Sequence, residues 1–281
     1  MSVETVLHAF LSLDPPELRE RCLEFLPSSR AEKIRALPPN ENPPHLEDLK
    51  KEDLLDRVHW SWFLPTLKSY APEEQTLFLS ALDPSSAAHL SNEIPCKIST
   101  KELSAMGSAY LRHILLSSLI GEHDRLIPRI FLPPSPLNQL LTLSKKELIL
   151  LIDLLSMHDL AAELRQIVET KILKNIYSYL TEMERKFLKQ VSLKPEPYAL
   201  PRIGLDRWDG NREVLRITLH RRGLARLGVA LSGEDPALVW YLCHQLDIGR
   251  GTALFKLCVR ESSLTTIDAA AKQVEELLGY G

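Results

Sequence analysis

The chain has 281 residues, of which 44% are hydrophobic and 25% are charged, so it can bury a substantial core and is not disordered by composition. Its net charge of −3 excludes a strong overall attraction to nucleic acid or to acidic membranes. Residues 1–16 lack the features of a signal peptide, and the apolar run at 148–155 is too short to span a bilayer. We therefore expect a cytosolic protein without membrane insertion.

A short phrase near the N-terminus occurs again later in the chain. Residues 10–27 and 78–95 both contain Leu-Asp-Pro, then a short helix-like segment and a second proline. Asp14 and Asp83 can accept hydrogen bonds from the free N–H groups of a helix start, and proline suits the first helical position. A third version of the phrase lies at 226–246. The phrases predict short capped helices, and their irregular spacing leaves open whether they are true repeats.

Further helix starts are predicted where a hydroxyl residue precedes a glutamate by three positions. This capping-box spacing occurs at Ser99, Ser144 and Thr181. Apolar residues from Leu160 to Tyr179 recur every third or fourth position, which predicts one continuous helical stripe. The segment 214–219 also resembles a strand, but its apolar positions fit a helical stripe that continues to Leu231 and is broken at Gly223, so we favour a helix. The predicted fold is all-α, a multi-helix array of short capped helices that includes the option of irregular helical repeats.

Three proline clusters divide the chain, at 38–44, 127–136 and 194–201. Proline fixes φ and removes a backbone donor, so we expect these clusters to be extended connectors or stiff turns. The parts expected are an N-terminal helical segment (1–44), a second helical part (45–127), a middle helical part (137–194) and a C-terminal helical part (202–281). They can pack as one or as two compact domains.

The sequence contains no arrangement of residues that indicates catalysis, a metal site or a cofactor. The consecutive Glu122, His123 and Asp124 point in different directions on a helix, and no P-loop, dinucleotide fingerprint or nucleophile elbow is present. Gly249-Arg250-Gly251 could form an anion nest, but we favour Gly249 as the left-handed residue that ends a helix. The cysteines are expected to be free, mostly buried thiols: Cys22, Cys96, Cys243 and Cys258.

Charge is distributed unevenly along the chain. Between Arg202 and Arg226 there are seven arginines and three acids, whereas residues 1–60 contain twelve acids and eight lysines or arginines. This polarity predicts that the arginines dock an acidic partner surface, but a solvated face and pairing with the chain's own acids stay open. Too few aromatic residues lie among the arginines to indicate nucleic-acid binding. The candidate partner-binding residues here are Arg212, Arg216, Arg221, Arg222 and Arg226.

A second candidate contact is the aromatic segment at 59–65. Trp60 and Phe63 fall on one helical face, while Trp62 points elsewhere. Such a cluster most often belongs to a core, but tryptophans on two faces of a short helix also suit contact with a partner. We therefore include Trp60, Trp62 and Phe63 among the candidate partner-binding residues.

Two stretches resemble the helical repeat modules of the flagellar motor switch protein FliG. Residues 226–246 are similar to that family's unit of an apolar run, Leu-Gly, a polar turn and an amphipathic helix. Residues 150–188 are similar to its later run of short capped helices. The charged torque helix of the family has no clear counterpart in this sequence. The resemblance implies a ring-forming structural component.

The chain as a whole resembles a second family more strongly. The features that carry this resemblance are its low cysteine content, its helical character and the proline connectors between FliG-like modules. The family is that of the cytosolic accessory proteins of bacterial type III secretion systems, in particular the SctK group (YscK, PscK, MxiK and OrgA). The resemblance implies a non-enzymatic adaptor that links the cytoplasmic domain of the inner-membrane ring to the pod protein of the sorting platform. Such an adaptor is cytoplasmic and meets the inner membrane only through its partners. A FliG-like ring component is the alternative, and an enzyme of unknown type is a further one.

Overall fold

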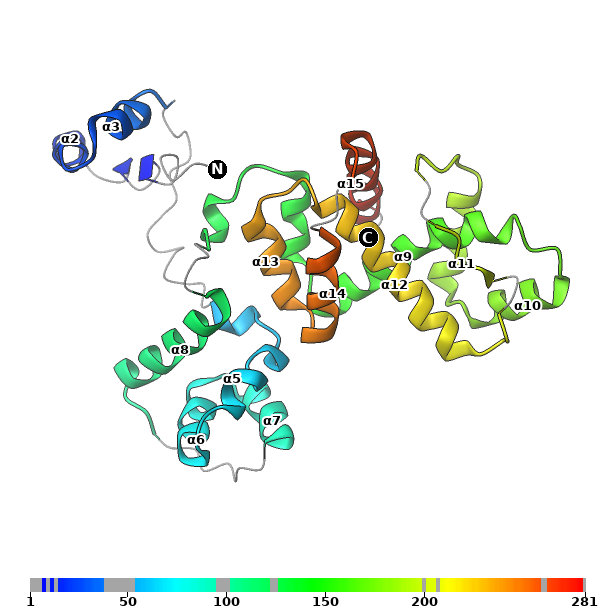
Figure 1. Cartoon of the computed structure of the whole chain (residues 1–281), viewed down its shortest axis with the longest axis horizontal. Helices are drawn as coiled ribbons and strands as arrows, with labels where there is room; N and C mark the ends of the chain where they lie inside the picture. Colours follow the sequence, from blue (N-terminus) through cyan, green and yellow to red (C-terminus); the bar gives the residue numbers. More distant parts are fainter. Residues whose placement is uncertain are drawn as a thin grey trace. The chain divides into compact units, whose positions relative to one another are not determined.

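The computed structural model of the chain describes residues 7–8, 11–12, 15–37, 54–94, 102–121, 126–198, 201–205, 208–258 and 262–279. The regular elements in these ranges are all α- or 3-10 helices, which confirms the predicted all-α fold (Figure 1). The chain forms two compact units, Met1–Pro134 and Ser135–Gly281. Their boundary falls inside the second proline cluster, and the predicted middle and C-terminal parts belong to one unit.

Two short helices of the first unit are α2 (Pro16–Glu24) and α3 (Ser28–Arg35). They pack against each other through a small core that contains Leu23 and Ile34. Asp14, the predicted cap of the first helix, lies outside the described residues, and the N-cap residue of α2 is Pro15, without a side-chain cap.

The rest of this unit contains further helices around α6 and α8. They are η1 (Leu54–Arg57), η2 (Trp60–Trp62), α5 (Leu64–Lys68), α6 (Pro72–Ala81), α7 (Pro84–Glu93), α8 (Ala105–Ile120) and η3 (Arg129–Phe131). Helix α6 packs against α8 and α7, and α7 packs against η2. Helix α8 begins after Ser104, whose hydroxyl accepts a hydrogen bond from the N–H of Gly107. The predicted helix start was at Ser99, which lies outside the described residues. Glu102 is described and is not helical, so α8 starts later than predicted.

Asp83 caps α7 as predicted. Its carboxylate accepts hydrogen bonds from the N–H groups of Ser85 and Ser86, both at 3.0 Å. We expect Asp83→Ala to lower the free energy of unfolding of the first unit by about 0.5 to 2 kcal/mol, the usual cost of losing such a cap. Urea unfolding followed by circular dichroism measures the change. The control is Glu93→Ala at the other end of the same helix, and equal stabilities of the two variants would contradict the role of the cap.

The second unit is built around two long helices. Its elements are η4 (Pro136–Thr142), α9 (Lys145–Leu164), α10 (Thr170–Tyr179), α11 (Glu182–Ser192), α12 (Arg212–Leu231), α13 (Pro236–Gln245), α14 (Ile248–Cys258) and α15 (Leu264–Leu278). Helices α9 and α12 pack against each other, α11 and α15 pack against α9, and α14 packs against α12 and α13 (Figure 1). The capping boxes at Ser144 and Thr181 and the cap at Asp235 are confirmed.

Close contact between α9 and α12 depends on a glycine. A Cβ atom placed on Gly223 would lie 1.8 Å from the backbone oxygen of Ile152. Helix α12 continues through Gly223 without a break. Because Gly223 has no side chain, the backbones of α9 and α12 can approach each other, and any side chain at this position would push them apart.

Two helix boundaries differ from the prediction. The apolar stripe from Leu160 to Tyr179 is not one helix, because α9 ends at Leu164 and α10 begins at Thr170. The β-branched residues of the intervening turn favour helix weakly, and in this turn Val168 is 95% exposed. Gly249 is not a left-handed residue after a helix. It lies in the first turn of α14, and the described glycines with positive φ are Gly121, Gly204 and Gly210.

Candidate partner-binding groove

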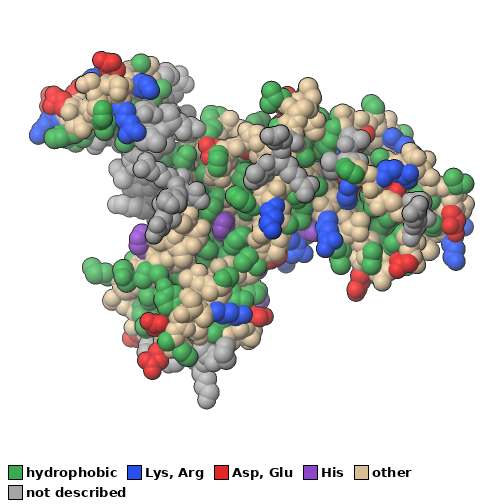
Figure 2. Space-filling model, viewed as in Figure 1, with side chains coloured by type: hydrophobic (Ala, Val, Ile, Leu, Met, Phe, Trp, Pro, Cys, Tyr) green, Lys and Arg blue, Asp and Glu red, His purple; other side chains and the backbone are tan. Residues whose placement is uncertain are grey.

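The structure brings part of the predicted arginine cluster to a single groove. Arg216 and Arg221 lie in a groove of about 490 Å³ that is formed by α9, α12 and α14, and Arg250 of α14 joins them. The other side chains of the groove are Asp153, His220, Ile149, Ile217, Leu224 and Ala253. Figure 2 shows Lys and Arg side chains near α12 and α14 on the face that it draws. The groove combines cations with an apolar wall.

A chain of hydrogen bonds joins the charged groups of the groove. The guanidinium of Arg216 donates to Glu184 and, at 3.4 Å, to Asp153. Nδ1 of His220 is 2.8 Å from Asp153, and Nε of Arg250 donates to Nε2 of His220 at 2.9 Å. Because Nε2 accepts this hydrogen bond, we assign the ring hydrogen of His220 to Nδ1, which donates to Asp153. The charges of Arg216 and Asp153 are therefore satisfied within the protein.

The anion nest considered as an alternative at Gly249–Gly251 is filled by the chain itself. The carboxylate of Asp247 accepts a hydrogen bond from the backbone N–H of Arg250 at 3.2 Å and also pairs with its guanidinium. Burial alone would raise the pKa of Asp247, but the hydrogen bonds from Arg250 outweigh burial and lower it. The start of α14 is thus occupied by an internal carboxylate.

Arg221 differs from the other arginines of the groove. It is exposed and forms no hydrogen bond or ion pair with any described residue. Ile217 precedes it by four residues and Val214 by seven, so the three side chains lie along one face of α12. Ile217 is 53% exposed and Val214 is 47% exposed. The surface next to the groove therefore offers two apolar side chains and one unpaired cation.

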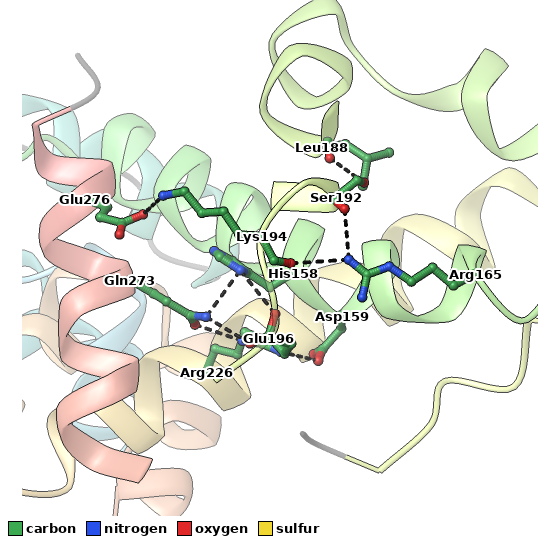
Figure 3. Close-up of polar contacts among 10 residues, drawn as sticks. All are labelled: His158, Asp159, Arg165, Leu188, Ser192, Lys194, Glu196, Arg226, Gln273 and Glu276. Carbon is green, nitrogen blue, oxygen red and sulfur yellow. Dashed lines mark hydrogen bonds and ion pairs between the residues drawn. The ribbon is translucent and has the colours of Figure 1, made fainter. Parts of the chain in front are cut away.

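Two arginines of the predicted docking face pair with the chain's own acids instead, one of them fully buried and the other partly buried. Arg226 is 1% exposed, and its guanidinium binds Asp159 at 2.6 Å, Glu196 at 2.8 Å and the amide oxygen of Gln273 at 2.8 Å (Figure 3). Arg222 donates to the same Asp159 at 3.0 Å. Their prediction as partner contacts is corrected here, because one turn of α12 places both on the face that packs against α9, where they pair with the chain's own acids. Arg212 remains exposed, 5.9 Å from the ring of Tyr179.

The third proline cluster is a strap that inserts an acid into this network. We call residues 194–198 the strap; it follows α11 and carries Glu196 between two prolines. Glu196 accepts hydrogen bonds from Arg226 and, at 2.9 Å, from Gln273, and it lies 3.4 Å from Nδ1 of His158 (Figure 3). Burial alone would raise the pKa of Glu196, but the hydrogen bond with His158 and the charge of Arg226 outweigh it and lower the pKa to about 2. In the sequence, the position of Glu196 between two prolines was the one signal for a fixed acid in this loop, and it was missed.

This pKa predicts a specific loss of stability in acid. The pKa of Glu196 falls from 4.5 to about 2 on folding, so its contribution is complete above about pH 4.5 and is lost as the pH decreases toward 2. The contribution is roughly 3 kcal/mol at neutral pH. We expect the stability difference between wild type and Glu196→Gln to shrink over this range, measured by urea unfolding at stepped pH. Glu276→Gln, in an exposed ion pair with Lys194, is the control, and a pH-independent difference for Glu196→Gln would contradict the assignment.

The aromatic segment has a mixed outcome. Phe63 is 1% exposed and packs in the core of the first unit, so its prediction as a partner contact is corrected by the structure. Trp60 is half-buried and stacks on His89 with 5.4 Å between the ring centroids, and Trp62 is also half-buried. Partner contact through these two tryptophans stays a prediction.

The described residues contain no group of three or more His, Cys, Asp or Glu side chains arranged to hold a metal ion. None of the described helices has the length and apolarity needed to cross a membrane. The predicted polar cluster at 122–124 and Cys96 lie outside the described residues. Cys22, Cys243 and Cys258 are free thiols, and burial raises the pKa of Cys258 to about 12.

The chain was also compared with known proteins. No family model, no curated protein and no solved structure matches it. Its function is therefore inferred from the surfaces described above and from the sequence resemblance.

Proposed function

We propose that the protein is a non-enzymatic adaptor that binds partner proteins, and that it acts in the cytoplasmic sorting platform of a bacterial type III secretion system. There it links the inner-membrane ring to the pod protein. The sequence resemblance supports the secretion context. The groove of the second unit, with its unpaired Arg221 beside exposed apolar side chains, is the observation that carries the adaptor function.

The groove favours a partner of a particular chemistry. Arg216 and Arg250 already pair with internal carboxylates, so among the described arginines of the groove Arg221 is the one with a charge left for a partner. Ile217 and Val214 provide exposed apolar surface on the same helix. A segment that places one carboxylate next to apolar side chains satisfies both features, whereas a strongly acidic stretch leaves most of its charges unpaired.

A second surface in the first unit supports binding to more than one partner. Helix α8 is rich in apolar residues, yet Leu115 is its one buried residue. Met106 is 83% exposed and Tyr110, one turn later, is 64% exposed. Exposed apolar side chains that lie next to each other mark interaction sites.

The same surface favours the alternative of a ring-forming component, in which α8 contacts another copy of the chain. Sedimentation equilibrium separates the two functions. An adaptor remains monomeric at micromolar concentration, and a ring component forms oligomers that Met106→Glu disrupts.

The adaptor function is tested by charge reversal in the groove. We expect Arg221→Glu to weaken binding of the ring or pod partner by about threefold to tenfold, because it replaces an attraction by a repulsion at an exposed site. Wild-type binding should weaken as salt increases, since exposed charges are screened. Co-purification with the tagged chain from secretion-competent cells, followed by binding titration of the purified partner, gives the measurement. Lys171→Glu, exposed on α10, is the control, and equal binding by both variants would contradict the proposed docking site.

A further inference from the structure

The strap is attached to the second unit at three points. At its start, Arg165, the residue directly after α9, donates hydrogen bonds to the backbone oxygens of Ser192 and Lys194, at 2.9 and 3.3 Å. In its middle, the Glu196 side chain enters the interior and is 17% exposed. At its end, the ring of Tyr198 lies 4.8 Å from the guanidinium carbon of Arg226. Figure 3 shows the first two of these attachments.

The groups that bind Glu196 come from three helices and not from the strap. Arg226 belongs to α12, Gln273 to α15 and His158 to α9 (Figure 3). Asp159 fixes the guanidinium of Arg226 independently of Glu196, at 2.6 Å. The helices therefore build a site with three donors or potential donors for a carboxylate, and a loop supplies the carboxylate.

The surroundings of the site contain unused capacity for binding. Nε of Arg226 and the hydroxyl of Tyr198 are buried and form no hydrogen bond of good geometry with a described residue, although the two side chains interact with each other. Hollows of about 420 and 160 Å³ border Glu196, one toward α15 and the other toward Arg222. A buried guanidinium N–H without a good acceptor is costly, so a ligand oxygen that reached it from one of these hollows would be stabilised.

We infer that Arg226, Gln273 and His158 form a carboxylate-binding site in which Glu196 is a built-in ligand that an external carboxylate can replace. This inference is independent of the groove and goes beyond the adaptor function. The ligand is either a small free carboxylate or the acidic side chain of a partner. Phosphate fits less well, because its second negative charge would lie close to Asp159, whereas a carboxylate reproduces the charge of Glu196.

Replacement of Glu196 requires only the strap to move. Pro195 and Pro197 are exposed on either side of Glu196. Because the strap is tethered, Glu196 competes with an effective concentration on the order of millimolar or higher. An external carboxylate therefore binds the wild type weakly and binds a chain that lacks the Glu196 carboxylate much better.

Chemical rescue of Glu196→Ala in the full chain tests this site. We expect the variant to lower Tm by on the order of 10 °C, because the buried charge of Arg226 loses a partner. Sodium acetate should then raise the Tm of Glu196→Ala in a saturable way, whereas sodium chloride at equal ionic strength should not. Wild type and Glu276→Ala, which removes an exposed acid next to the strap, are the controls and should respond equally to the two salts.

A short peptide separates the two sources of the carboxylate. The probe is a blocked peptide with the strap sequence Lys-Pro-Glu-Pro-Tyr, and its control has Gln in place of Glu. Rescue by acetate and by the Glu peptide assigns the site to acidic side chains of a partner, and rescue by acetate alone assigns it to small free carboxylates. If acetate and chloride act equally on Glu196→Ala, the inference is wrong and Arg226 only forms a structural ion pair. Should the variant be unfolded in chloride, recovery of the helical signal on adding acetate is the same test.

Discussion

Replacing Arg226 by methionine should lower the free energy of unfolding of the second unit by about 3 to 5 kcal/mol. The guanidinium is buried and binds Asp159, Glu196 and Gln273. Methionine is apolar and cannot pair with these groups. The largely buried carboxylates of Asp159 and Glu196 therefore lose part of the positive charge that stabilises them. Urea unfolding monitored by circular dichroism gives the change in stability.

The matched control is Arg222→Met, one turn earlier on the same helix. Arg222 also binds Asp159, but its side chain is 18% exposed and Asp159 retains Arg226 as a partner, so a clearly smaller loss is expected. The double variant Arg226→Met with Glu196→Gln should lose less than the sum of the two single losses, because each change removes the partner of the other. Equal losses for the two methionine variants would contradict the central role of Arg226.

Gly223→Ala should destabilise the second unit by about 3 kcal/mol, at the upper end of the usual cost of overpacking. The added Cβ atom would lie 1.8 Å from the backbone oxygen of Ile152, whereas ordinary contacts begin near 3.4 Å. A backbone atom cannot rotate away as a side chain does, so α9 and α12 have to separate. The cost exceeds the roughly 1 kcal/mol that alanine gains over glycine within a helix.

Gly249→Ala is the matched control for this prediction, since Gly249 is also helical. Its Cβ atom would meet Oδ1 of Asp247 at 3.4 Å, an ordinary contact, so the variant should be as stable as wild type or more stable by up to about 1 kcal/mol. Thermal unfolding of the two alanine variants side by side gives the comparison. A Gly223→Ala protein that melts like Gly249→Ala would show that the helices adjust without cost.

The helix starts were predictable because a cap is local. Asp83, Ser144 and Thr181 bond to N–H groups only two or three residues ahead, so the sequence contains both partners of each bond. The break between α9 and α10 was missed because the apolar spacing continues through the turn. The weak helix propensity of the β-branched Ile167 and Val168 was the local signal against one continuous helix.

The site was predictable only in part, because charge pairing is not local. The acids that neutralise Arg222 and Arg226 include Asp159, more than sixty residues earlier, and the sequence does not show that α9 and α12 are neighbours. An arginine on a docking face and an arginine in a buried pair therefore look the same in sequence. Arg221 and Arg226 are five residues apart, and the first is exposed whereas the second is buried.

The position of Gln273 along the chain has a consequence for biosynthesis. Arg226, Glu196 and Asp159 leave the ribosome well before α15, which carries Gln273 and covers part of α9 and α12. Until α15 has been made, the nascent second unit lacks this cover and the polar network is incomplete. Since domains generally fold as units during synthesis, the second unit reaches its native state only after α15 has emerged. A ribosome stalled before residue 264 should therefore display a second unit that proteases cut readily, while Asp83 already caps α7 in the first unit.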